Sequence, residues 1–99
     1  MLYVIVAEDV PNSKAKRQAA RPRHIDYLKE LIDLGRVVLA GPTPAIDSPD
    51  PGSAGMSGSV IIAEFDSIES ARAWVANDPY SLEGVFSHVI VKPFIKVAP

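Results

Sequence analysis

Arg21-Pro22-Arg23-His24-Ile25-Asp26-Tyr27-Leu28 opens the main helix that this sequence predicts. Proline suits the first position of a helix and disfavours helical geometry in the residue before it. Apolar residues then recur at three- and four-residue spacing, as in an amphipathic helix: Ile25, Leu28, Leu31 and Ile32. Gly35 is the natural stop. We therefore predict a helix over 22–34. A short helical segment over 14–20, capped by Ser13, precedes it and is either separate from it or continuous with it.

Four apolar stretches surround this helix and are predicted to be strands: 2–7, 36–42, 59–65 and 85–97. A second helix follows the third strand, because Asp66 and Glu69 have the spacing of a capping box. Pro93 indicates an edge or a bulge in the last strand. Right-handed crossovers then place both helices on one face of a four-stranded antiparallel sheet. The predicted fold class is α+β, a ferredoxin-like βαββαβ arrangement, formed as a single domain by residues 1–99.

The predicted strands are apolar on both alternating sets of side chains. In the third strand, for example, Val60 and Ile62 alternate with Ile61 and Ala63. Two helices cover only one face of a sheet, so the other face is expected to be a large apolar surface, which monomers rarely expose. We therefore expect a homodimer in which two sheets pack face to face about a twofold axis. The alternative is that the C-terminal tail or a long loop folds over this face.

Composition argues against several classes of function. The 99 residues are 47% hydrophobic and 22% charged, as in a soluble globular protein. A formal net charge of −2 gives no field that attracts nucleic acid. With no cysteine, two histidines and no glycine-rich phosphate motif, neither a metal site nor a cofactor is expected. No apolar run is long enough to span a membrane and the N-terminus lacks a basic region, so the expected compartment is the cytoplasm.

His24 and Asp78 are the candidate catalytic residues. His24 shares a helix face with Leu28 and therefore points toward the sheet. Near a helix N-terminus, the dipole favours the neutral imidazole of a general base. Asp78 lies at a helix end, an unfavourable dipolar position for a carboxylate, and is able to orient an imidazole. The alternatives are a half-buried histidine bonded to a backbone carbonyl and an aspartate that only stops the helix. The sequence does not fix the distance between the two.

Arg21, Tyr80 and Ser48 are the candidate substrate-binding residues. Arg21 lies three residues before His24 at the predicted helix start and can pair with a small carboxylate or phenolate. Tyr80 and Ser48 carry hydroxyls that can donate to a ligand, although loop hydroxyls are common. The other basic residues of the segment 14–23 are expected to be solvated.

Several stretches along the chain resemble one known family. They include Leu2-Tyr3-Val4-Ile5, Arg21-Pro22-x-His24, Ala40-Gly41-Pro42-x-Pro44, Ala73-Trp74, Asp78-Pro79-Tyr80 and Val91-Lys92-Pro93-Phe94. Together they resemble the YciI-like, or YCII-related, family. The resemblance implies a ferredoxin-like fold assembled as a dimeric alpha-beta barrel. It also implies an active site built on a histidine and an aspartate, which map to His24 and Asp78. A dehydrochlorinase acting on a chlorinated hydroxyquinol is similar.

The leading hypothesis is a small cofactor-independent enzyme that acts on a small anionic or phenolic molecule by proton transfer, in an isomerisation or an elimination. His24 takes or donates the proton, Asp78 holds its tautomer, and Arg21 binds the negative oxygen of the substrate. The proline- and glycine-rich loop 43–58 closes over the pocket. The alternatives are a ligand-binding or regulatory dimer module without turnover and a structural dimerisation domain. The residues do not separate the first of these from the enzyme.

Overall fold

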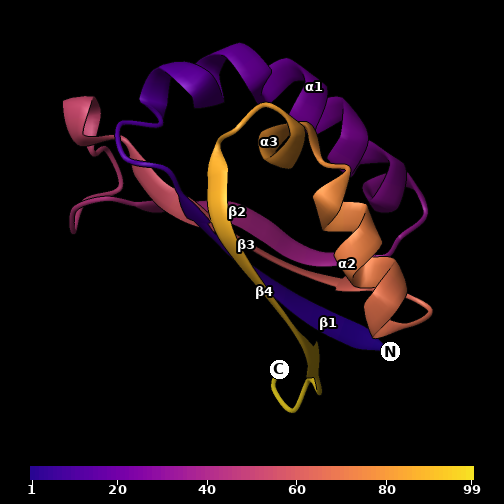
Figure 1. The fold of residues 1–99 in the computed structure, drawn as a ribbon. Helices are drawn as coiled ribbons and strands as arrows, with labels where there is room; N and C mark the ends of the chain where they lie inside the picture. Colours follow the sequence, from indigo (N-terminus) through magenta and orange to yellow (C-terminus); the bar gives the residue numbers. More distant parts are fainter.

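The computed structural model describes residues 1–99 and has the predicted order of elements with two short additions, η1 and α3. The elements are β1 (Leu2–Asp9), α1 (Lys14–Asp33), β2 (Val37–Pro44), the 3-10 helix η1 (Gly52–Ala54), β3 (Met56–Glu64), α2 (Ile68–Ala76), α3 (Pro79–Leu82) and β4 (Phe86–Phe94). Figure 1 shows the α-helices together on one side of a curved sheet. The predicted fold class, a ferredoxin-like α+β fold, is confirmed.

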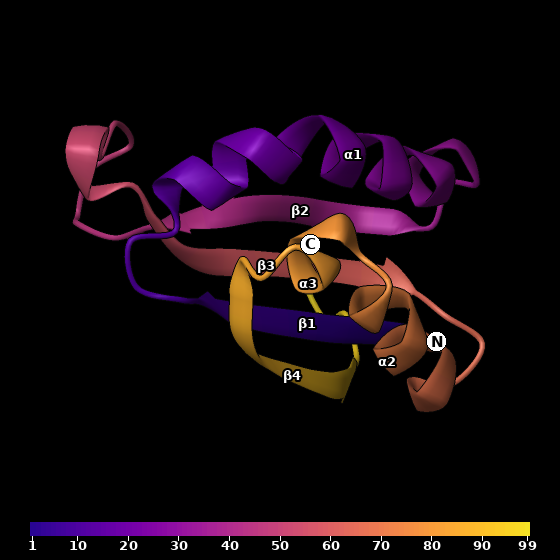
Figure 2. The ribbon, with the colours of Figure 1, turned by 45° about the horizontal axis from the view of Figure 1, so that its top comes forward.

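The sheet has the strand order β2-β3-β1-β4, and every neighbouring pair is antiparallel. In the two central strands, alternate residues point toward the helices and are buried: Tyr3, Ile5, Ala7, Ser59, Ile61 and Ala63. In Figure 2, α1 runs alongside β2, whereas α2 and α3 lie nearer β1 and β4. Because β4 is an edge strand, it accommodates Pro93, as predicted.

Helix α1 is continuous through Pro22, so the predicted helix start at this residue is wrong, and the alternative of one helix continuous with the preceding segment is confirmed. A proline inside a helix removes a hydrogen bond and costs about 3 kcal/mol. The helix tolerates this because Pro22 lies on its exposed side, while one buried stripe continues past it. The stripe comprises Arg17, Ala20, His24, Leu28 and Leu31. His24 therefore lies in the middle of α1, too far from the N-terminus for the helix dipole to act on it.

The structure confirms the predicted end of α1 and places the capping box of α2 one residue later than predicted. Gly35 has a φ of 71°, in the left-handed region, and ends α1 as predicted. The capping box of α2 is formed by Ser67 and Ser70 instead of Asp66 and Glu69. The Ser67 hydroxyl accepts from the Ser70 N–H, and the Ser70 hydroxyl accepts from the Ser67 N–H, each at 3.0 Å. None of the helices has both the length and the apolar character needed to cross a membrane.

The predicted loop 43–58 is shorter in the structure, because β2 extends to Pro44 and β3 begins at Met56. The remaining segment, 45–55, contains η1. The Nζ atom of Lys14 donates to the carbonyl of Gly52 at 3.0 Å, so α1 holds the tip of this segment in place.

The face of the sheet opposite the helices is uncovered. Its apolar side chains come from all four strands: Val4, Val6, Leu39, Val60, Ile62 and Ile90. Val6 and Ile90 are paired across the β1–β4 ladder, and both are exposed. The C-terminal tail does not shield this face, since Ile95 and Val97 are themselves exposed. The second face is therefore apolar and open, as the alternating pattern predicts.

We expect Ile5→Ala to lower the free energy of unfolding by about 2–5 kcal/mol, because the truncation leaves a cavity in the centre of the core. Ile5 is 1% exposed. Urea denaturation followed by circular dichroism measures the change. Ile95→Ala is the matched control, because Ile95 is 77% exposed and its truncation should alter stability by no more than about 0.5 kcal/mol. Equal losses in the two variants would contradict this placement of the core.

Candidate active site

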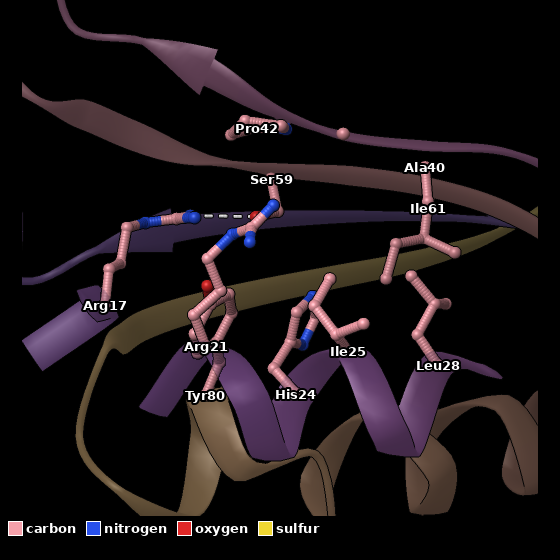
Figure 3. A pocket seen from close by; sticks show the side chains of 11 residues that line it. Arg17, Arg21, His24, Ile25, Leu28, Ala40, Pro42, Ser59, Ile61 and Tyr80 are labelled. Atoms are coloured by element: carbon pink, nitrogen blue, oxygen red, sulfur yellow. Dashed lines mark hydrogen bonds between the residues drawn. The ribbon is translucent and has the colours of Figure 1, made fainter. Parts of the chain in front are cut away.

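A cavity of about 170 Å³ lies between α1 and the helix-facing side of β2 and β3. In Figure 3, α1 presents successive side chains toward the sheet, and Tyr80 approaches from α3. The polar residues of the lining are Arg17, Arg21, His24, Ser59 and Tyr80. Leu28 and Ile61 contribute apolar wall. The α1 residues lie at helical spacings of three and four, so one face of α1 supplies most of the chemistry.

His24 and Asp78 form a buried hydrogen-bonded pair. The Nδ1 atom of His24 lies 2.8 Å from Oδ1 and 3.0 Å from Oδ2 of Asp78. Asp78 is 0% exposed and His24 is 8% exposed. Because a carboxylate only accepts, the network assigns the hydrogen of the neutral ring to Nδ1 and the lone pair to Nε2. No protein group bonds Nε2, and no buried side-chain nitrogen or oxygen lacks a partner, so Nε2 is in contact with the cavity.

Local contacts within the segment around Asp78 hold this carboxylate in position independently of His24. Asp78 is the N-cap of α3, and its Oδ1 accepts the N–H of Tyr80 at 2.9 Å. Pro79 follows at the first helical position, where its missing N–H is not needed. The sequence interpretation placed Asp78 at the unfavourable end of a helix. The structure shows instead that it begins the next helix, where a carboxylate satisfies an otherwise unpaired N–H.

Tyr80 stacks its ring on the imidazole of His24. The ring centroids are 3.9 Å apart and the planes differ by 8°. The guanidinium carbon of Arg17 lies 4.9 Å from the centroid of the Tyr80 ring. Burial raises the pKa of Tyr80, and the positive charges of Arg17 and Arg21 oppose this effect. The phenol therefore stays neutral around pH 7 and keeps its hydrogen for donation. Tyr80 thus lines the cavity, as expected of a ligand-binding residue, and also supports the His24 ring.

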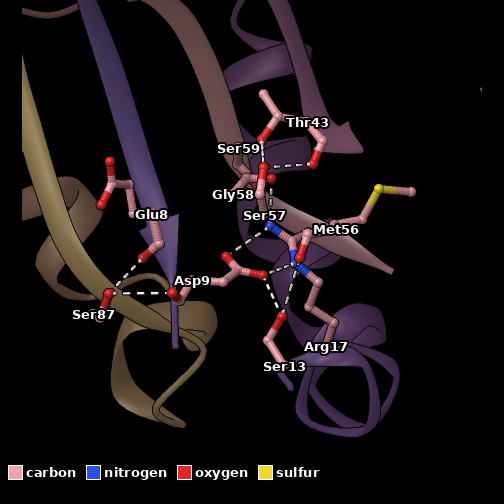
Figure 4. A network of polar contacts seen from close by, with 10 residues as sticks. All are labelled: Glu8, Asp9, Ser13, Arg17, Thr43, Met56, Ser57, Gly58, Ser59 and Ser87. Atoms are coloured by element: carbon pink, nitrogen blue, oxygen red, sulfur yellow. Dashed lines mark hydrogen bonds and ion pairs between the residues drawn. The ribbon is translucent and has the colours of Figure 1, made fainter. Parts of the chain in front are cut away.

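Arg17 is a polar residue of the cavity that the sequence interpretation missed. Its Nη2 donates to the carbonyl of Gly58 at 2.7 Å and to the hydroxyl of Ser59 at 2.8 Å. It also donates to the carboxylate of Asp9 through Nε and Nη2, as Figure 4 shows. The missed signal is its spacing, because a residue seven positions before His24 shares its face in a continuous helix.

Arg21 and Ser48 are placed very differently. Arg21 lines the cavity and forms no ion pair with any acidic side chain. Ser48 does not line the cavity, and its hydroxyl donates to the carbonyl of Asp50 at 3.0 Å within the 45–55 segment. The structure thus brings four of the five predicted site residues together and leaves Ser48 outside. It contains no group of three or more histidine, aspartate and glutamate side chains close enough to hold a metal ion.

Sequence comparisons place this architecture among known proteins. The profile of the YCII-related domain matches residues 1–95. Protein YciI of Escherichia coli O6:H1 is 56% identical over 97 residues, which cover 98% of this chain and 99% of that protein. An uncharacterized protein of Haemophilus influenzae is 50% identical over 97 residues, with the same shares of both chains covered.

A solved structure shares the fold. It is the 5-chloro-2-hydroxyhydroquinone dehydrochlorinase TftG of Burkholderia phenoliruptrix, in complex with 2,5-dihydroxybenzoquinone. The two structures superpose with a TM-score of 0.84 and 29% sequence identity, over 96% of this chain and 94% of that chain.

We expect Asp78→Asn to leave α3 capped and to allow both tautomers of the neutral His24 imidazole. The amide oxygen still accepts the N–H of Tyr80, but the amide NH₂ can also donate to an unprotonated Nδ1, so that both tautomers of the neutral ring become stable. Nitrogen NMR of the imidazole shows which nitrogen carries the hydrogen. We expect the Nδ1–H form in the wild type and a mixture in the variant. A mixture in the wild type would contradict the assigned pair.

Proposed function

The chain belongs to the YCII-related domain family, as its sequence resemblance indicates, and we propose that it is a small cofactor-independent enzyme. In this proposal, His24 transfers a proton in an isomerisation or an elimination on a small anionic or phenolic molecule. The observation that carries the proposal is the pairing of Nδ1 of His24 with the buried Asp78, which leaves Nε2 facing the cavity. A fixed tautomer with a free basic nitrogen is what a general base requires.

Asp78 and Tyr80 act on His24 and not on the substrate's reacting atoms. When Nε2 accepts a proton, the ring becomes a cation, and Asp78 stabilises it through the hydrogen bond to Nδ1. The stacked ring of Tyr80 offers a π face to the same cation. In an elimination, Nε2 accepts the proton while the leaving group departs with its bonding electrons. The protein therefore supplies a base, and no electron acceptor is needed.

Arg21 is the proposed partner of the negative oxygen of the substrate. It lines the cavity next to His24 and has no acidic side chain to neutralise it. A guanidinium suits a phenolate or a carboxylate because it donates two parallel hydrogen bonds. The dehydrochlorinase with the same fold supports this substrate class, because its name and its bound molecule both describe a hydroxylated six-membered ring.

We further propose that two copies of the chain pack through their open sheet faces. The supporting observation is the apolar surface over β1, β3 and β4, in which Val6 and Ile90 are exposed side by side. Burying such a surface against a second copy removes it from water, and a twofold axis makes the contact self-complementary.

We expect His24→Gln to reduce turnover by a factor of about 10²–10⁴, because glutamine cannot take up the proton. The assay follows chloride release from 5-chloro-2-hydroxyhydroquinone and product formation from a panel of substituted hydroquinones by mass spectrometry. His88→Gln is the matched control, since His88 is exposed and lies outside the cavity. Unchanged turnover in the His24 variant would refute the catalytic role. Compounds that raise the Tm of the wild type without any product would favour a binding module.

We expect Ile90→Asp to convert a dimer into a monomer, because the charge enters the centre of an apolar contact. Light scattering measures the mass of both proteins at the same concentration. Leu82→Asp, on the exposed side of α3, introduces the same charge away from the sheet and should leave the dimer intact. A monomeric wild type would overturn the proposed assembly.

A further inference from the structure

A second cavity, of about 330 Å³, adjoins the one that holds His24. It lies between the first half of α1 and the 45–55 segment, whose Gly52 is held by Lys14. The two cavities share four lining residues: Arg17, Arg21, Pro42 and Tyr80. We call the cavity with His24 the inner cavity and the second one the outer cavity. Because of the shared lining, a molecule bound in the inner cavity can extend into the outer one.

The size of the inner cavity limits what it can hold. An apolar protein cavity of about 150 Å³ accommodates one benzene ring, and the inner cavity measures about 170 Å³. Its apolar wall, with Leu28 and Ile61, suits the face of such a ring. One six-membered ring therefore fills most of the inner cavity, and the outer cavity offers room for a longer substituent.

The outer cavity is lined by three basic side chains and one acidic one: Lys14, Arg17, Arg21 and Asp50. The charge of Arg17 is balanced by Asp9, with which it forms an ion pair. Lys14 donates to the carbonyl of Gly52, and Asp50 adds one negative charge to the lining. Arg21 has no such acidic partner. A guanidinium without an ion-pair partner thus lies where the two cavities meet.

We propose that the outer cavity is a subsite for an anionic arm, so that the substrate is a phenolic ring carrying a short side chain that ends in a carboxylate. The inference rests on the proposed function, because it places the reacting ring beside His24. Arg21 binds the carboxylate at the junction, and Lys14 keeps the wall of the subsite in place by holding Gly52. A carboxylate attached directly to the ring does not need the outer cavity, whereas one at the end of a short chain does.

Two matched compounds test this subsite: 3-(2,5-dihydroxyphenyl)propanoate and its neutral methyl ester. Calorimetric titration under nitrogen gives the Kd of each. We expect the acid to bind the wild type at least about fivefold more tightly than the ester, since a charge-assisted hydrogen bond contributes more than about 1 kcal/mol, or about fivefold. In Arg21→Gln, the acid and the ester should bind with equal affinity.

Lys16→Gln is the matched control, because it removes the same charge from α1 at a residue that lines neither cavity. It should retain the preference for the acid. An equal loss of preference in both variants would overturn the proposal by reducing it to a long-range field effect. So would a preference for the acid that survives in Arg21→Gln.

The methyl resonances of Ile61 separate failure of this inference from failure of the proposed function, because Ile61 lines only the inner cavity. Equal affinities for acid and ester, with the Ile61 methyl shifts still perturbed, would reject the anionic subsite and leave the ring site beside His24 standing. If neither compound perturbs these methyl groups, the ring does not occupy the inner cavity, and both proposals fail.

Discussion

The buried carboxylate of Asp78 is the constraint on which the arrangement of the site depends. A charge removed from water costs several kcal/mol unless it is paired and hydrogen-bonded. Asp78 has no exposed surface, and it finds its donors on two different elements. The N–H of Tyr80 comes from α3, and Nδ1 of His24 comes from the middle of α1. A shift of α1 against α3 would leave the carboxylate without its second partner. The interaction that joins these helices therefore also orients the imidazole.

Arg17 and Asp9 form a buried ion pair close to Tyr80, whose partners also come from different elements. The guanidinium of Arg17 is held by the carboxylate of Asp9 and by the carbonyl of Gly58, which belong to two different strands. The neutral Tyr80 ring then lies between this cation and the imidazole of His24. The carboxylates of Asp9 and Asp78 thus position Arg17 and His24, and Nε2 of His24 is left without a protein partner.

Local patterns predict most of the fold, because alternating strands and the glycine after α1 are properties of neighbouring residues. Pro22 shows where such reasoning fails. Its own preference predicts a helix start, but the burial of Arg17 and Ala20 continues the helix on its N-terminal side. The burial of Arg17 in turn depends on β1 and β3, which no nearby residue indicates. The His24–Asp78 contact joins residues 54 positions apart, so the sequence offers both residues without fixing their distance.

The site and the open apolar face are opposite sides of the same strands. Along β3, Ser59 and Ile61 face the helices, whereas Val60 and Ile62 face outward. A shift of one residue in register would exchange the two sets and bring Val60 toward the cavity. Gly58 helps to prevent this, because a Cβ there would lie 2.0 Å from the carbonyl oxygen of Ala7 on β1, so only glycine fits at this position of the ladder. The carbonyl of the same residue accepts from Arg17. Gly58 therefore restricts the register of the β1–β3 pair and also helps to position the guanidinium of Arg17, which lines the cavity.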